Sequence, residues 1–158
     1  LLASGIASSP REAFDQAMHA LDSGEAAERF GRMISLLGGP GDFVEKARAY
    51  LPEAEIVQPV KAPRNGFVHD IDARAIGIAV IELGGGRRKP EDTIDHSVGL
   101  TDCLPVGAQT IRGEPLAMVH ARTAAQAEAA TATVLAAYGF TEEKPRARKT
   151  VLRRLAGA

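Results

Sequence analysis

One short stretch of the chain combines the residue types that proteins use to bind phosphate. Residues 82 to 102 read ELGGGRRKPEDTIDHSVGLTD, with three glycines directly before three cations. Glycines let the backbone approach an anion closely, and arginine and lysine supply positive charge. We call residues 84 to 93 the glycine–arginine loop. Its candidate functional residues are Gly84, Gly85, Gly86, Arg87, Arg88 and Lys89.

The elements around this loop argue against a phosphate cradle. Cradles run from strand to glycines to helix, so that a helix N-terminus faces the anion. Here the aspartate at position 72 and the apolar spacing predict a helix over residues 73 to 83, ended by Gly84 in a left-handed conformation. Ile78 and Ile81 also allow a strand, but the flanking aspartate and glycines favour a helix. Three cations suit the negative C-terminal end of a helix without any ligand, so we expect a flexible cap with solvated charges.

The other polar residues do not form a recognisable catalytic motif. The histidines, which are too dispersed for a metal-ligand spacing, are His19, His69, His96 and His120. Asp92 and Asp95 are expected to cap a turn after the loop, and Cys103 to be a small buried apolar residue. The sequence therefore predicts no catalytic residue, no cofactor-binding residue, no metal ligand and no cofactor.

Composition narrows the classes of partner. The chain has 19 basic and 20 acidic residues, so no overall field attracts nucleic acid or anionic lipid. No apolar run approaches the roughly 20 residues that span a bilayer. A single cysteine excludes an intrachain disulfide and suits the cytoplasm. We expect a cytoplasmic protein with neither nucleic acid nor a membrane as its partner.

The first third of the chain is predicted to be helical. Ser9 begins a capping box, and Asp42 is placed to cap a third helix. The second helix carries an apolar stripe formed by Phe30, Met33, Ile34 and Leu37. Short helices alone bury little surface. Because the chain also begins with leucine rather than methionine, we expect these helices to cover an upstream part of a longer polypeptide.

The remaining residues predict a mixed unit of helices and strands. Residues 56 to 60 have the composition of an edge strand interrupted by proline, and residues 116 to 120 that of a buried strand. A final helix begins at a capping box at Thr123, with Gly139 as its left-handed end and Phe140 against Leu135. A further edge strand is expected at residues 150 to 152. We place the domain boundary near residue 60, with a helical tail over 1–60 and an α+β domain over 61–158.

Three segments resemble the C-terminal part of bacterial thymidine phosphorylases, in the pyrimidine-nucleoside phosphorylase family. They read FGRMISLLGGPGDFVEKARAYLP, GFVHDIDARAIGIAVIELGGGRRKPEDTIDHSVGLTD and VGAQTIRGEPLAMVHA. The resemblance implies an α+β C-terminal domain with a barrel-sandwich or hammerhead-like β unit. It also implies that the helices before this domain belong to the family's α/β catalytic domain. The tripeptide that biotinyl or lipoyl carriers need around their lysine is absent from the sequence.

The resemblance also implies a function. Enzymes of this family are pentosyltransferases of pyrimidine salvage, which convert thymidine and phosphate to thymine and 2-deoxyribose 1-phosphate as homodimers. Their phosphate- and base-binding residues lie upstream of this region, so the isolated chain is expected to be inactive. The glycine–arginine loop would then serve domain closure. Acceptance of uridine is left open, and the alternative is a stand-alone barrel-sandwich binding module without catalytic activity.

Overall fold

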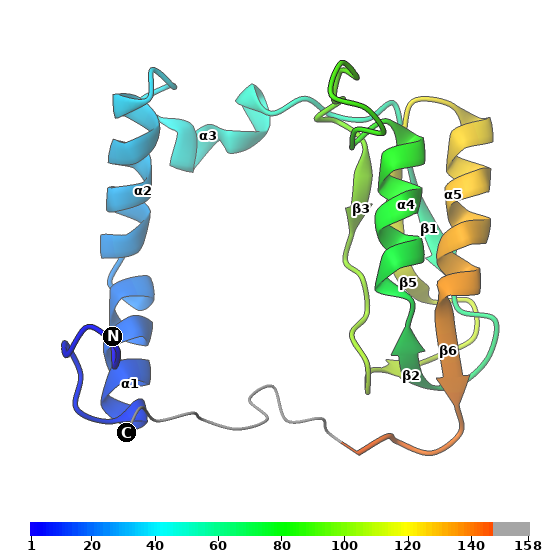
Figure 1. Cartoon of the computed structure of the whole chain (residues 1–158), viewed down its shortest axis with the longest axis horizontal. Helices are drawn as coiled ribbons and strands as arrows, with labels where there is room; N and C mark the ends of the chain where they lie inside the picture. The colour runs from blue at the N-terminus through cyan, green and yellow to red at the C-terminus, as the bar shows by residue number, and fades with distance from the viewer. Residues whose placement is uncertain (147–158) are drawn as a thin grey trace. The chain divides into compact units, whose positions relative to one another are not determined.

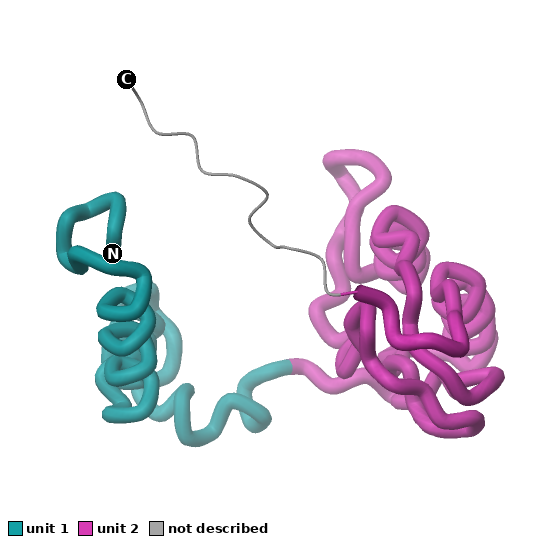
Figure 2. Tube along the Cα trace, turned by 90° about the horizontal axis from the view of Figure 1, so that it is seen from below, with its two compact units in different colours: residues 1–51 teal, residues 52–158 magenta. Residues whose placement is uncertain are grey.

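The computed structural model describes residues 1–146 and divides the chain into two compact units. The first unit is Leu1–Leu51 and the second begins at Pro52 (Figure 2). The strand expected at residues 150 to 152 lies outside the described residues. None of the helices in residues 1–146 has the length and hydrophobicity of a membrane-spanning segment.

The first unit consists of three helices, as the sequence predicted (Figure 1). They are α1 (Pro10–Asp22), α2 (Glu25–Leu36) and α3 (Phe43–Tyr50). The capping box at the start of α1 is confirmed, because the backbone N–H of Glu12 donates to Ser9 Oγ at 3.2 Å. The Glu12 carboxylate in turn accepts from the backbone N–H of Ser8 at 2.8 Å. Local hydrogen bonds therefore fix where α1 begins.

The third helix differs from the prediction at its start. Asp42 occupies the N-cap position, but its side chain makes no capping hydrogen bond. Its carboxylate instead accepts from the Tyr50 hydroxyl at 2.5 Å and pairs with Lys46 at 2.8 Å. Lys46, followed by Tyr50, accordingly lowers the pKa of Asp42. The predicted side-chain cap was wrong, because two partners further along the helix take the carboxylate.

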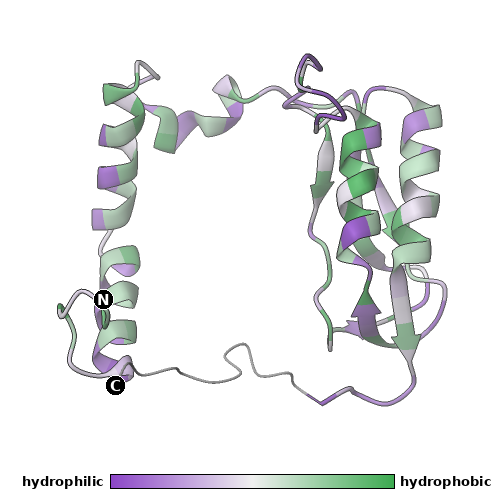
Figure 3. Cartoon of the chain, viewed as in Figure 1, coloured by the Kyte–Doolittle hydropathy of each residue, from purple (hydrophilic) through white to green (hydrophobic). Residues whose placement is uncertain are grey.

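The apolar stripes of these three helices remain exposed. No residue of α1, α2 or α3 is buried, and Leu36 and Leu37 are 79% and 78% exposed. Figure 3, which is coloured by hydropathy, shows hydrophobic positions along each of these helices. Phe30 and Phe43 make an edge-to-face contact, with ring centroids 6.1 Å apart. The unit therefore presents an apolar surface that its own residues do not cover.

The second unit is an α+β domain, which confirms the predicted class. Its first antiparallel sheet has the strand order β1 (Ile56–Lys61), β5 (Pro115–Ala121), β3 (Gly99–Thr101). Its second sheet has the order β4 (Gln109–Thr110), β2 (Gly66–Ile71), β6 (Tyr138–Thr141). Two helices, α4 (Ala73–Leu83) and α5 (Ala124–Ala137), lie side by side against these strands (Figure 1).

The core of the second unit centres on β5. This strand lies in the middle of its sheet, and Leu116, Ala117 and Val119 are fully buried, as predicted. Helix α5 contributes small buried residues, including Ala127 and Ala130. Small side chains let α5 approach β1 and β5 closely. Among the described residues of the second unit, those that are buried are aliphatic except for Thr110 and Tyr138.

Strand β1 explains why the units divide after Leu51, earlier than the boundary expected near residue 60. This strand pairs along its length with β5, from Ile56 opposite Ala121 to Lys61 opposite Pro115. It is an edge strand, which is where a proline such as Pro59 is tolerated. Its partner lies far along the chain, so a change in local composition near residue 60 did not reveal this pairing.

The end of α5 also differs from its prediction. The helix passes directly into β6, with Tyr138 extended at φ −95° and ψ 123°. Gly139 is absent from the positive-φ residues, so the predicted left-handed end is wrong. Instead Gly139 pairs with Asp70 beside an irregularity in β2, and a Cβ on it would lie 2.1 Å from Asp70 Oδ1. Pairing with β2 takes precedence over the local helix-end signal.

Gly66 at the start of β2 should be the glycine least tolerant of substitution. It has φ +144°, and a Cβ there would lie 2.4 Å from the backbone oxygen of Thr141. We expect Gly66→Ala to lower the free energy of unfolding by about 3 kcal/mol, measured by urea denaturation. Gly77→Ala is the matched control, because nothing lies within 4 Å of that Cβ position in α4. It should stabilise the protein by about 1 kcal/mol, and equal effects of the two variants would contradict the argument.

Candidate functional site

The glycine–arginine loop follows α4, whose predicted ends are both confirmed. Asp72 Oδ1 accepts from the backbone N–H groups of Arg74 and Ala75, each at 3.0 Å. Gly84 ends the helix with φ +100°, in the left-handed region. The loop therefore leaves the negative end of the α4 dipole, as the sequence predicted.

The two glycines after Gly84 are closely packed. A Cβ on Gly85 would lie 3.1 Å from both Val80 Cγ1 and the backbone oxygen of Val98. A Cβ on Gly86 would lie 2.7 Å from Ile81 Cγ1. A side chain at Gly86 would force Ile81 to move, and one at Gly85 would be tightly packed, because the backbone lies against the last turn of α4. The sequence predicted a flexible cap, whereas the structure shows tight packing at the base of the loop.

Asp92 organises the tip of the loop, which confirms its predicted turn-capping role. Its Oδ2 accepts from the backbone N–H groups of Arg88 and Lys89, at 3.0 and 3.1 Å. Arg87 Nε donates to the backbone oxygen of Asp92 at 3.1 Å, and Arg88 pairs with Glu82 at 3.3 Å. The cations are exposed, and both guanidinium groups contact acceptors within or beside the loop.

Asp95 holds the chain where it returns from the loop. Its backbone N–H donates to the Gly84 oxygen at 2.9 Å. Its Oδ1 accepts from the backbone N–H and the hydroxyl of Ser97 at 3.0 and 2.7 Å, and its Oδ2 pairs with Arg122. Ser97 and then Arg122 lower the pKa of Asp95 to about 2, so the carboxylate is ionised at neutral pH. The predicted turn cap is confirmed, but the partner Arg122 was not anticipated.

A cavity of about 270 Å³ lies beside this arrangement. It is lined by the end of α4, by residues 93 to 95, by Arg122, which precedes α5, and by Gln126 in the first turn of α5. The hydroxyl of Thr123 accepts from the backbone N–H of Gln126 at 3.2 Å, so the predicted cap of α5 is confirmed. The loop base and the N-terminus of α5 are therefore adjacent.

The remaining candidate residues do not converge on one site. His120 Nε2 lies 2.9 Å from Thr101 Oγ1, which donates to Asp102 Oδ2 at 3.0 Å. Residues 1–146 contain no group of three His, Cys, Asp or Glu side chains placed to hold a metal ion. Cys103 is exposed, so its predicted burial was wrong. The neighbouring Leu104 packs against the core instead, and its backbone N–H donates to the Leu116 oxygen at 2.8 Å.

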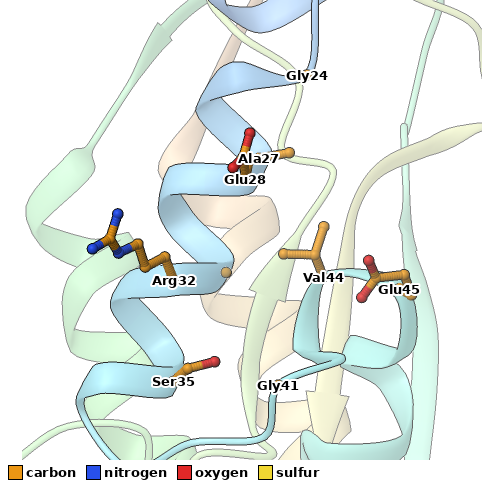
Figure 4. Close-up of a pocket in the computed structure, with 9 residues that line it drawn as sticks. Gly24, Ala27, Glu28, Arg32, Ser35, Gly41, Val44 and Glu45 are labelled. Atoms are coloured by element: carbon orange, nitrogen blue, oxygen red, sulfur yellow. The ribbon is translucent and has the colours of Figure 1, made fainter.

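A hollow of the first unit, which the sequence did not predict, lies between α2 and α3 (Figure 4). Its volume is about 520 Å³, and small residues of α2, including Ala27, Gly31 and Ser35, form one wall. Val44 approaches this wall, with its Cγ2 at 3.3 Å from a Cβ built on Gly31. The four-residue spacing of small side chains was the available signal. The polar side chains of Glu28, Arg32, Ser35 and Glu45 also line it.

Comparison with known proteins places the loop inside a recognised domain. Residues 67–141 match the family described as the pyrimidine nucleoside phosphorylase C-terminal domain. Over 155 residues, or 98% of its length, the chain is 50% identical to a thymidine phosphorylase of Mesorhizobium japonicum and 46% identical to one of Rhizobium meliloti. It covers 35% of each of these proteins, about a third of their length.

The matched region begins in β2 and ends in β6, so it contains α4, the loop, β5 and α5. The similarity to thymidine phosphorylases extends beyond it, through nearly the whole chain. This chain therefore belongs to the pyrimidine nucleoside phosphorylase family and carries its C-terminal domain.

Proposed function

We propose that this chain is the C-terminal portion of a thymidine phosphorylase. Such an enzyme cleaves thymidine with phosphate to give thymine and 2-deoxyribose 1-phosphate. The observation that carries the proposal is 50% identity to a thymidine phosphorylase over 98% of the chain. In this proposal the whole enzyme is a cytoplasmic homodimer that needs no cofactor.

The chemistry of this reaction needs residues that converge on a substrate. Phosphate must reach the anomeric carbon while the enzyme stabilises an oxocarbenium-like sugar and a departing pyrimidine anion. The cations of the glycine–arginine loop are exposed and face no enclosed substrate cavity in the described part of the chain. We therefore assign the substrate-binding residues to the upstream part of the enzyme and expect this chain alone to be inactive.

The loop is suited to domain closure rather than to holding phosphate by itself. Its base is packed against α4, while Arg87, Arg88 and Lys89 are exposed at its tip. The present partner of Arg88 is an exposed carboxylate, and exposed ion pairs contribute only about 1 kcal/mol or less. Little free energy would therefore be lost if Arg88 exchanged Glu82 for an anionic group in the interdomain cleft of the whole enzyme. Closure of this kind excludes water from a reaction site.

The helices of the first unit have a matching role in the proposal. Their exposed apolar residues would cover the α/β catalytic domain of the whole enzyme, to which the helices of residues 1–51 would belong. Exposed apolar patches of this kind mark surfaces that a partner covers. The proposal therefore explains why the stripe on α2 contains Phe30, Met33 and Leu37 although these side chains are exposed.

The isolated chain should consequently self-associate through this stripe. We expect light scattering at high protein concentration to show species larger than a monomer, because apolar patches attract one another in water. The double variant Met33→Glu, Leu37→Glu should remain monomeric. Gln16→Glu, which adds a charge at a polar position of α1, is the control and should associate like the unchanged chain. A monomer at every concentration would contradict the assignment of this surface.

A chimera tests the proposed function. The upstream part of the Mesorhizobium japonicum thymidine phosphorylase would be joined to this chain, and thymine release from thymidine and inorganic phosphate would be measured. We expect an active enzyme, because this chain would supply the portion that it matches. A folded but inactive chimera would favour the alternative, a binding module without catalytic activity.

A further inference from the structure

We propose that Asp95 is a positioning residue that fixes the base of the glycine–arginine loop to the start of α5. The inference rests on the proposed closure function and names what orients the loop within it. Asp95 contacts Gly84, Ser97 and Arg122 rather than the loop cations. It acts by holding both chain ends of the loop, so that Arg87 and Arg88 extend from a fixed base.

The contacts of Asp95 join three elements. Its backbone N–H donates to the backbone oxygen of Gly84, the C-cap residue of α4, at 2.9 Å. Its carboxylate accepts two hydrogen bonds from Ser97, which precedes β3, and pairs with Arg122. Arg122 stands between the last residue of β5 and Thr123, the N-cap of α5. The ion pair therefore connects the loop to a residue that regular structure holds on both sides.

The base and the tip of the loop differ in how well their contacts are shielded. The Asp95 side chain is only 15% exposed, although its partner Arg122 is 62% exposed. The tip pair of Arg88 and Glu82 is 69% and 51% exposed. Shielded charge-assisted hydrogen bonds are stronger than exposed ones. When the loop moves, the pair of Arg88 and Glu82 at its tip should therefore break, while the pair of Asp95 and Arg122 at its base should persist.

The packing of the glycines supports the same division. A Cβ on Gly86 would overlap Ile81, and one on Gly85 would be in tight contact with Val80, so these glycines are packed rather than a free hinge. The cations begin directly after Gly86, and three extended residues reach at most about 10 Å. A fixed base with a short reach presents the guanidinium groups in a narrow range of positions. Loss of the Asp95 contacts would widen that range.

Limited trypsin digestion of the full 158-residue chain tests this inference without any catalysis. Trypsin cleaves after arginine and lysine, and mass spectrometry would follow cleavage after Arg87 and Arg88 alone. We expect Asp95→Asn and Arg122→Ala each to accelerate that cleavage about tenfold, because local opening exposes the backbone to the protease. Arg122→Lys keeps the charge and should have a smaller effect.

Two comparison variants separate the base from the tip. Asp15→Asn breaks an exposed pair with Arg11 in α1 and should leave cleavage unchanged. Glu82→Gln removes the tip pair and should change cleavage by less than about twofold. Rates within twofold of the unchanged chain for both Asp95→Asn and Arg122→Ala would overturn the inference. So would an effect of Glu82→Gln as large as that of Asp95→Asn.

Activity of the chimera supplies the functional readout. Arg122→Ala should lower kcat about threefold at an unchanged thermal midpoint, and Arg122→Lys should restore most of it. Unchanged kcat in Arg122→Ala would overturn the positioning role. If the chimera itself is inactive, the proposed function fails, whereas the trypsin experiment still decides whether Asp95 fixes the loop. The two failures are therefore distinguishable.

Discussion

Alone, the 158-residue chain should release no detectable thymine from thymidine and inorganic phosphate. Phosphorolysis needs a bound phosphate and a positioned nucleoside, and in the proposed function the residues that hold them lie in the upstream part of the enzyme. Enzymes accelerate reactions by at least about a millionfold, so loss of the binding residues should take the rate below detection. Chromatographic measurement of thymine at high protein concentration would check this result.

The matching control is the chimera with the upstream part of the relative, assayed under the same conditions. Its activity would show that the assay detects the reaction and that this chain is folded competently within the enzyme. Thymine release by the purified chain alone would contradict the prediction if a substitution within the chain abolished it. Release that no such substitution affects would point to a contaminating enzyme.

Elements with local signals were predicted correctly from the sequence. Ser9, Asp72 and Thr123 each accept a hydrogen bond from a backbone N–H two or three residues ahead. Such contacts depend on neighbouring residues only, so a capping pattern contains the necessary information. The end of α4 at Gly84 was predicted for the same reason.

Elements decided by contacts that compete with the local signal were not predicted. Gly139 has the composition of a helix end, but pairing with β2 places it in a strand. Asp42 has the composition of a helix cap, but Lys46 and Tyr50 take its carboxylate. The first competing interaction joins residues far apart in the sequence, and the second depends on how α3 is folded. Local propensity is a weak prior that tertiary contacts override.

The candidate site shows the same division. The position of the loop after a helix and the turn formed by Asp92 followed from residue types and order. The packing of Gly85 and Gly86 and the pairing of Asp95 with Arg122 did not, because both require the folded arrangement of α4 and α5. A glycine triplet in a sequence allows either flexibility or close approach, and only the structure shows which applies.

Replacing both loop arginines should slow the intact enzyme. In the chimera we expect Arg87→Ala, Arg88→Ala to lower kcat about tenfold or more, because preorganised cations that meet developing negative charge lower the barrier. The stability of this chain should hardly change, since both side chains are exposed and their removal leaves no buried group unpaired. Steady-state kinetics with thymidine and phosphate, together with thermal denaturation, would measure both quantities.

Two matched variants test whether the effect belongs to the loop rather than to lost positive charge in general. Arg74→Ala, Arg112→Ala removes two exposed arginines outside the loop in the same unit and should leave kcat unchanged. Arg87→Lys, Arg88→Lys keeps the charge but not the planar donors, so it should recover only part of the rate. An unaltered kcat in the alanine double variant would reduce the loop to a packed connection between α4 and β3. An equal loss in the control pair would assign the effect to the overall field instead, since long-range fields act irrespective of position in the loop.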